Sequence, residues 1–143
     1  MKIKFMILSI LIIFLYSCMP ANLFVKLTPE EKIYLEKAMA QPLTFIVDAK
    51  DSELKWALAQ SFIAKYSPMK IETITEYLLE TYSPYGTRFG YKVIRTPLEE
   101  GDEFDVRCLY DNPFSKNDAY QSAHIFAYYL ATGEIIPRLI RHF

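Results

Sequence analysis

The chain has 143 residues, of which 52% are hydrophobic and 23% charged, so its composition is that of a packed protein and excludes disorder over most of its length. The formal net charge is −1 and no basic block occurs, which excludes a surface that follows nucleic-acid phosphates. With cysteines only at positions 18 and 108, a multiple-disulfide framework is excluded too.

The first element along the chain is an export signal over residues 1–17. Lys2 and Lys4 give it a positive start, and an almost wholly apolar run follows from Phe5 to Tyr16. About a dozen apolar residues fall short of the roughly 20 that span a bilayer. We therefore expect the segment to be cleaved, although a retained anchor helix stays open as an alternative.

The apolar run ends in Leu15-Tyr16-Ser17-Cys18, which resembles the lipobox of bacterial lipoproteins. An aliphatic residue stands three before the cysteine and a small residue just before it; Tyr16 departs from the family pattern, in which a small residue is commoner there. The resemblance implies that a diacylglycerol is transferred to the Cys18 thiol and that a peptidase cuts between Ser17 and Cys18. It also implies that the new amino group can be acylated, as with palmitate. An ordinary cleaved signal is the alternative.

Lipidation of Cys18 would place the protein in the bacterial cell envelope. Each buried CH₂ contributes about 0.8 kcal/mol, so two or three acyl chains hold a protein firmly on a membrane. Met19 follows in place of the aspartate that retains some lipoproteins at the inner membrane, so we expect the outer membrane. Cys108 would then lack an intramolecular disulfide partner. Residues 18–27 would form a tether, and residues 28–143 a single domain.

Two helices are predicted at the start of this domain. Thr28-Pro29-Glu30-Glu31 is a capping-box start, and Gln41-Pro42 ends the helix after about Met39. Asp51 is expected to cap a second helix that runs to Tyr66 and has an unusually wide apolar surface. Its apolar residues are Leu54, Leu58 and Phe62 along one side and Trp56, Ala59, Ile63 and Tyr66 along another.

Three strands in a meander are predicted next. The period changes to two over residues 69–80, where β-branched residues are dense. A second strand, Arg88–Thr96, follows the turn at Ser83–Gly86, and the turn Pro97–Asp102 leads to the third. The third strand has the clearest alternation, with Phe104, Val106, Cys108 and Tyr110 on one face.

A last helix is predicted up to Thr132. Asp118 with Gln121 gives a second capping-box pattern, and Gly133 is placed to follow the helix end. One face is apolar, with Ala119, Ala123, Phe126, Ala127 and Leu130. A strand over the same residues is the alternative, although it separates apolar from polar side chains poorly. Residues 135–143 are expected to pack their isoleucines and leucine as a tail.

The predicted fold class is α+β, with helices packed on a three-stranded antiparallel β-meander in the order α-α-β-β-β-α. If Ala119–Thr132 were a strand, one helix against a four-stranded sheet would be similar to the cystatin and nuclear-transport-factor-like class. A carrier or inhibitor on a cystatin-like frame would follow from that alternative.

No residues of the sequence are assigned a catalytic role. His124 is expected on the surface flank of the last helix, with Tyr120 and Tyr128 one turn to either side. Adjacent residues of a strand point to opposite faces, so Arg107 does not activate Cys108, which we expect to be a small buried hydrophobe. A small periplasmic hydrolase, the alternative function, would need His124 beside a carboxylate in a pocket.

Neither a metal nor a cofactor is expected. Two acidic loops are separated by a strand of about seven residues, or roughly 20 Å, so they cannot share an ion, and neither has calcium-loop spacing. Solvated turns and a helix cap account for them. Glycines do not form a phosphate-binding loop. The acidic loops contain Glu99, Glu100, Asp102 and Glu103, and Asp111, Asn112, Asn117 and Asp118.

The sequence predicts a lipid-anchored cell-envelope protein with a non-catalytic binding or adaptor domain. The partner would be a protein, a peptide or a surface polymer, not a nucleic acid, and the oligomeric state is left open. Aromatic residues make up 15% of the chain and favour an aromatic binding patch. The expected members of this patch are Tyr82, Tyr85, Tyr120, His124 and Tyr128.

Overall fold

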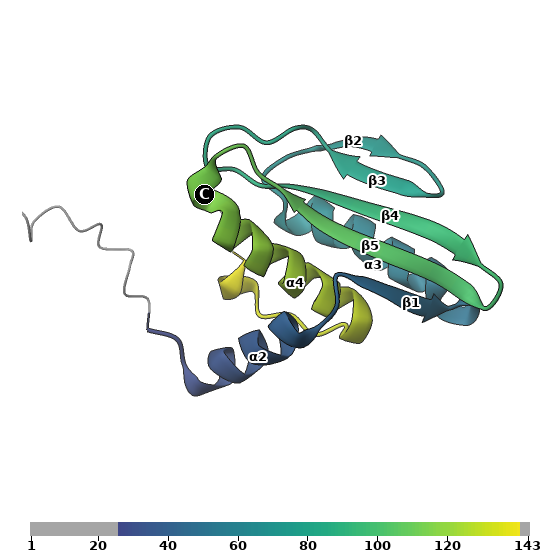
Figure 1. Cartoon of the computed structure of the whole chain (residues 1–143), viewed down its shortest axis with the longest axis horizontal. Helices are drawn as coiled ribbons and strands as arrows, with labels where there is room; N and C mark the ends of the chain where they lie inside the picture. Colours follow the sequence, from purple (N-terminus) through teal and green to yellow (C-terminus); the bar gives the residue numbers. More distant parts are fainter. Residues whose placement is uncertain (1–25, 141–143) are drawn as a thin grey trace, which may run out of the picture.

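The computed structural model describes residues 26–140 as an α+β fold built on a five-stranded antiparallel sheet (Figure 1). The export signal with Ser17 and Cys18 and most of the tether lie outside the described residues. The elements are α2 (Pro29–Ala40), β1 (Thr44–Asp48), α3 (Ala49–Tyr66), β2 (Ile71–Ile74), β3 (Leu78–Thr81), β4 (Gly90–Leu98), β5 (Gly101–Leu109) and α4 (Lys116–Thr132), with short 3₁₀ turns at Pro113–Ser115 and Pro137–Leu139.

The sheet has the strand order β1-β5-β4-β3-β2, and every neighbouring pair is antiparallel. The predicted α+β class is therefore confirmed, whereas the predicted three-stranded sheet is wrong. The prediction lacked two strands for different reasons. One follows a turn that has none of the usual turn residues, and the other is very short.

The first extra strand arises because residues 69–80 form a hairpin, β2–β3, and not one continuous strand. The Thr75 hydroxyl accepts hydrogen bonds from the backbone N–H groups of Tyr77, at 3.2 Å, and Leu78, at 2.9 Å. A threonine side chain thus stabilises the turn at a place where glycine, proline, asparagine or aspartate is usual. The sequence around Thr75 has none of these four residues, so the period-two pattern continues across the turn and predicts one strand in place of two.

The second extra strand, β1, has only five residues and pairs with the first half of β5. Gly101 allows the two chains to approach closely, because a Cβ atom there would lie 2.1 Å from the carbonyl oxygen of Val47. Such a short segment between two helices carries little period-two signal. Its place in the sheet depends on a glycine far away in the sequence.

Both long helices, α3 and α4, cover the same face of the sheet. Phe62 of α3 stacks on Phe126 of α4 with 4.0 Å between ring centroids, and both rings meet the edge of Tyr91 of β4 at 5.5 Å. The first helix, α2, packs against α4 (Figure 1). These aromatic contacts fix α4 against the sheet.

The capping box at Thr28 is confirmed, but the other two predicted helix starts are wrong by two or three residues. The α3 helix begins at Ala49 and α4 at Lys116, so Asp51 and Asp118 lie inside the first turns. An acidic side chain there still stabilises the helix through its dipole, which explains why the two positions resemble caps. The predicted end is confirmed, since Gly133 adopts a left-handed φ of 81°.

Residues 119–132 are helical, so the strand alternative is wrong, and the cystatin-like frame loses the observation that it rested on. The predicted apolar face of α4 is buried as a whole. In α3 the face of Trp56, Ala59 and Ile63 is buried too, and on the other predicted side Phe62 is buried and Leu58 packs against the core, whereas Leu54 is 60% exposed.

The end of the described chain folds back onto the domain, as predicted for the apolar residues of the tail. Leu139 and Ile140 are buried. Arg138 forms a two-pronged ion pair with Glu31 of α2, with N–O distances of 2.7 Å. Within residues 26–140, no helix has the length and apolar character needed to cross a membrane.

Candidate functional site

A cleft of about 310 Å³ lies between the end of β5 and the first half of α4, and we call it the β5–α4 cleft. Its apolar walls are Leu43, Val106 and Cys108 on the sheet side and Ala119, Tyr120 and Ala123 on the helix side. Tyr110, Lys116 and Asn117 supply its polar side chains, and Arg107 is a further lining residue. The cleft therefore has apolar walls and the cationic side chain of Lys116, with no carboxylate among its lining residues.

The cleft exists because β1 is shorter than β5. Strand β1 pairs only with Gly101–Asp105, and one further hydrogen bond of 2.9 Å joins the N–H of Val106 to the carbonyl of Leu43. Before Leu43 the chain belongs to the connection from α2, which packs on α4. Beyond Val106, β5 has β4 on one side and, among the described residues, no strand on the other.

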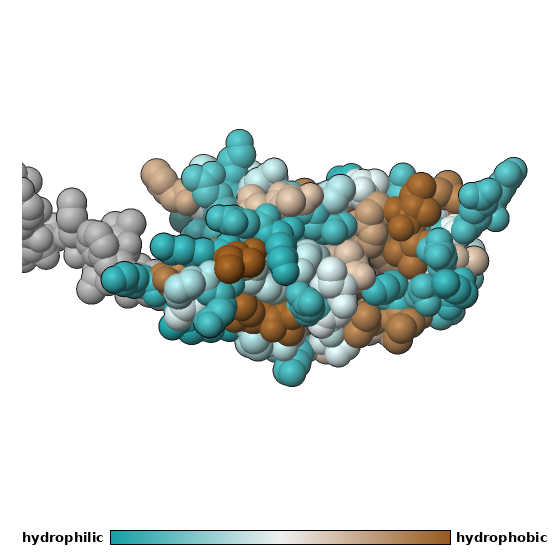
Figure 2. Space-filling model, turned by 90° about the horizontal axis from the view of Figure 1, so that it is seen from below, coloured by the Kyte–Doolittle hydropathy of each residue, from teal (hydrophilic) through white to brown (hydrophobic). Residues whose placement is uncertain are grey.

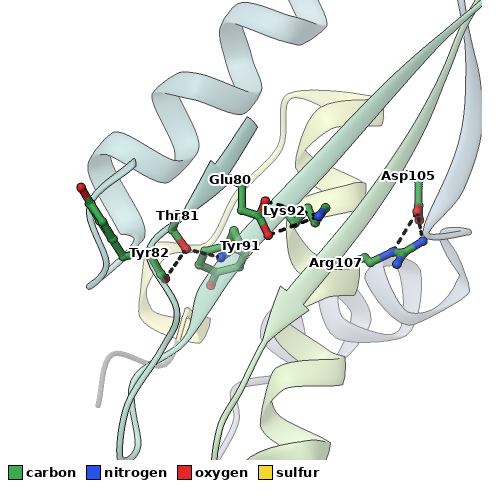
Figure 3. A network of polar contacts seen from close by, with 7 residues as sticks. All are labelled: Glu80, Thr81, Tyr82, Tyr91, Lys92, Asp105 and Arg107. Atoms are coloured by element: carbon green, nitrogen blue, oxygen red, sulfur yellow. Dashed lines mark hydrogen bonds and ion pairs between the residues drawn. The ribbon is translucent and has the colours of Figure 1, made fainter. Parts of the chain in front are cut away.

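Cys108 lies half-buried in the wall of the cleft. Burial raises the pKa of its thiol far above the ordinary value, so the thiol stays protonated at neutral pH and is a poor nucleophile. Arg107 points to the opposite face and pairs with Asp105 at 2.6 Å (Figure 3). The predicted alternation of these neighbours is confirmed, although Cys108 borders a cleft and is not enclosed in the core.

The predicted aromatic patch is divided by the structure. Tyr120 is about half exposed and lines the cleft. Tyr82 and Tyr85 are also about half exposed, but they lie in the connection from β3 to β4 and do not line it. In Figure 3 the Tyr82 ring points away from Tyr91, and the Tyr85 ring stacks under the guanidinium of Arg88.

His124 and Tyr128, the other two predicted members, are buried, with exposed fractions of 5% and 8%. The expectation of a surface histidine is wrong because the end of α2 covers this flank of α4. The Nδ1 atom of His124 lies 2.9 Å from the carbonyl oxygen of Gln41, and Tyr34 of α2 meets the Tyr128 ring edge-on at 5.4 Å. Helical periodicity in α4 alone cannot show which flank a second helix covers.

The immediate surroundings of His124 do not match those of a hydrolytic base. Its Nε2 atom is buried without a hydrogen-bond partner among the described residues, and its ring packs against Tyr120. The ring does not line the cleft. Its neighbours are thus a backbone carbonyl and a tyrosine, where the hydrolase hypothesis needs a carboxylate beside it in a pocket.

The sequence predicted Asp102 in a solvated turn, and this is wrong. Asp102 is only 8% exposed and lies at the opposite end of β5 from the cleft. Its carboxylate accepts hydrogen bonds from the Ser52 hydroxyl and, at 2.6 Å, from Nε of Arg95. Arg95 also pairs with the exposed Glu53 at 2.6 Å. Desolvation alone would raise the pKa of Asp102, but these hydrogen bonds and the charge of Arg95 outweigh it and lower the pKa.

Other surface features are more dispersed than the cleft. The ion pairs Lys92–Glu80 and Arg107–Asp105 lie on the sheet (Figure 3). On the face that carries α2 and β1, apolar surface occurs in separate patches among polar residues (Figure 2). Within residues 26–140, no group of three or more histidine, cysteine, aspartate or glutamate residues is placed to hold a metal ion.

Comparison of the chain with protein-family models, with curated proteins and with solved structures found no match.

The Asp102–Arg95 pair predicts a pH-dependent contribution to stability. Replacing Asp102 by asparagine should lower the free energy of unfolding at about pH 7 by about 2 kcal/mol, since Arg95 keeps Glu53 as a partner. The folded pKa of Asp102 is lowered, so its contribution is present above the unfolded value near 3.9 and is lost as pH falls through the folded pKa. The two proteins should therefore converge once the pH falls below the lowered folded pKa of Asp102.

Urea unfolding at several pH values measures this difference. Glu53→Gln is the matched control, because the Glu53 side chain is 80% exposed and its pair with Arg95 should contribute less than about 1 kcal/mol. Equal losses of unfolding free energy in the two variants at neutral pH would contradict the prediction that the buried Asp102 pair contributes more to stability than the exposed Glu53 pair.

Proposed function

We propose that this protein is a lipid-anchored protein of the bacterial cell envelope whose domain binds a partner, without catalysis, in the β5–α4 cleft. The anchor rests on the resemblance of Leu15–Cys18 to a lipobox. The binding function rests on one observation, the apolar cleft with the cationic side chain of Lys116 beside it.

The composition of the cleft supports binding. Small-molecule and peptide sites are typically concave, mostly apolar and equipped with a few oriented polar groups. Here Leu43, Cys108 and Tyr120 provide accessible apolar surface, and Lys116 provides a positive charge without a carboxylate among the other lining residues. A ligand with an apolar body and a negative group complements this arrangement. Binding it would remove apolar surface from water at about 25 cal/mol per Å².

The chemistry of the individual groups favours binding over hydrolysis. The raised pKa of Cys108 keeps its thiol protonated, and Asp102 is held by Arg95 at the far end of β5. The imidazole of His124 is buried against Gln41 and Tyr120 and does not line the cleft. We therefore propose a binding or adaptor domain in preference to a small periplasmic hydrolase.

The tether gives this proposal a spatial consequence. Residues 18–27 would separate the lipid on Cys18 from the start of α2. Ten extended residues reach at most about 35 Å, so the cleft could meet partners beyond the membrane surface while the lipid stays in the bilayer.

The cleft predicts binding of an apolar anionic probe, anilinonaphthalene sulfonate. The folded wild-type protein should enhance the fluorescence of this dye, with the naphthalene in the cleft and the sulfonate near Lys116. Ala123→Leu, which fills the cleft, and Lys116→Glu, which reverses the charge, should each weaken binding at least about fivefold.

Lys50→Glu is the matched control, because Lys50 is exposed and lies at the start of α3, outside the cleft. Near-ultraviolet circular dichroism separates cleft binding from dye binding to a loosened core. Dye binding that is unchanged in both Ala123→Leu and Lys116→Glu would remove the cleft as the binding site.

The lipidation proposal predicts that Cys18 is the acylated residue. Cells that express the wild-type protein and are fed an alkyne fatty acid should yield labelled protein in the membrane fraction. Cys18→Ala should lose both the label and the membrane association, because its acyl chains provide the anchor. Cys108→Ala serves as the control and should keep both. A labelled, membrane-bound Cys18→Ala protein would contradict the proposed anchor.

A further inference from the structure

Among residues 26–140, the wall of the cleft formed by β5 has a backbone edge without a paired strand. The N–H of Val106 points toward β1, where it donates to Leu43. Residues two apart in a strand direct their backbone groups to the same edge, so the N–H and C=O of Cys108 face this edge too, at the level where β1 has ended. The other side of the ladder agrees, since Tyr91, which is paired with Cys108, turns its N–H away from β5 and donates it to Thr81.

This free edge and the apolar cleft adjoin at Cys108. Its backbone forms part of the edge, while its side chain lines the cleft opposite α4. An extended chain lying along the edge would form backbone hydrogen bonds to Cys108, and one of its side chains would point into the cleft. The same residue would thus offer both the affinity and the specificity of strand addition.

We propose that the β5–α4 cleft binds an extended peptide segment of a partner protein, which adds as a short strand beside Val106–Tyr110. This inference rests on the proposed binding function and names the class of partner. An apolar side chain of the peptide enters the cleft between Cys108 and Ala123. An acidic residue two positions along the peptide, on the same face of the added strand, faces Lys116, the cationic group at the start of α4.

The backbone edge favours a peptide over a lipid as the occupant. A fatty acid could fill the apolar cleft and offer its carboxylate to Lys116, but its acyl chain has neither an N–H nor a C=O for Cys108. A peptide supplies both. Desolvated backbone groups without partners are unfavourable, so an occupant that satisfies them has the advantage.

The other free edges of the described sheet lack this combination. Strand β2 has only four residues, and its register shifts between Ile71 and Thr73, which makes it an irregular template for a further strand. Neither β1 nor β2 contributes a residue to the cleft. The end of β5 is thus where an unpaired edge and a side-chain pocket coincide.

A selection experiment with the full chain, purified as expressed in a bacterial host, tests the proposal. The probe is a phage-displayed library of random heptapeptides, and selected sequences are then synthesised and measured by fluorescence anisotropy. The enriched peptides should share an apolar residue two positions from an aspartate or glutamate. If no peptide is enriched, or if the enriched peptides lack an apolar residue, the proposal is overturned.

Peptide backbone methylation then tests strand addition without altering the protein. Each amide of a selected peptide is N-methylated in turn. Methylation of the amide that pairs with Cys108 should weaken binding at least about tenfold, and methylation of its neighbours, which face away, should be tolerated. Equal tolerance at every position would overturn strand addition.

Protein variants locate the bound peptide. Ala123→Leu and Lys116→Glu should each weaken binding of the acidic peptide at least about fivefold, whereas Lys50→Glu should leave it unchanged. Binding that is unaffected by both cleft variants would overturn the proposed location, and Lys116→Glu on the helix surface remains decisive if Ala123→Leu folds poorly.

Binding of dodecanoate and of the sulfonate dye distinguishes failure of the peptide inference from failure of the proposed function. Cleft-dependent binding of dodecanoate or the dye without peptide binding would support a ligand-binding cleft and overturn the peptide inference. Dye binding that is insensitive to both cleft variants would instead overturn the proposed function.

Discussion

The feature on which the rest of the structure depends is the unequal length of two paired strands. Strand β5 has nine residues and β1 has five, so the ladder between them ends at Asp105 with one further bond from Val106 to Leu43. Backbone pairing is close to obligatory in a buried sheet. Where β1 ends, the sheet therefore leaves an edge that water or another chain must satisfy, and the β5–α4 cleft opens at that place.

The opposite wall of the cleft is fixed by aromatic packing. Phe126 of α4 is held between Phe62 of α3 and Tyr91 of β4, and all three side chains are almost completely buried. Such packing tolerates little rearrangement. The first half of α4 is thus presented to β5 at a constant position, with small alanines on the facing side. A larger residue at Ala119 or Ala123 would close the space.

Much of the fold could be predicted from the sequence wherever a local signal matched the tertiary outcome. The capping box at Thr28, the alanine-rich face of α4 and the alternation around Val106 are such signals. The β2–β3 turn was not predicted because Thr75 stabilises it without a usual turn residue. The burial of His124 depends on how α2 lies across α4, and the cleft depends on where β1 ends. The burial of His124 and the position of the cleft both follow from contacts between distant segments, so no local pattern encodes them. Of the predicted patch residues, Tyr120 lines the cleft.

Among the described residues, the backbone of Cys108 has no pairing partner on the cleft side. Residue-resolved amide hydrogen exchange on the full chain measures this directly. Val106, whose N–H donates to Leu43, serves as the internal reference. We expect the Cys108 amide to exchange at least about 100-fold faster than the Val106 amide, since exchange at Cys108 needs no opening of the sheet. Equal protection of the two amides would contradict the account, because it would mean that the edge of β5 is already closed.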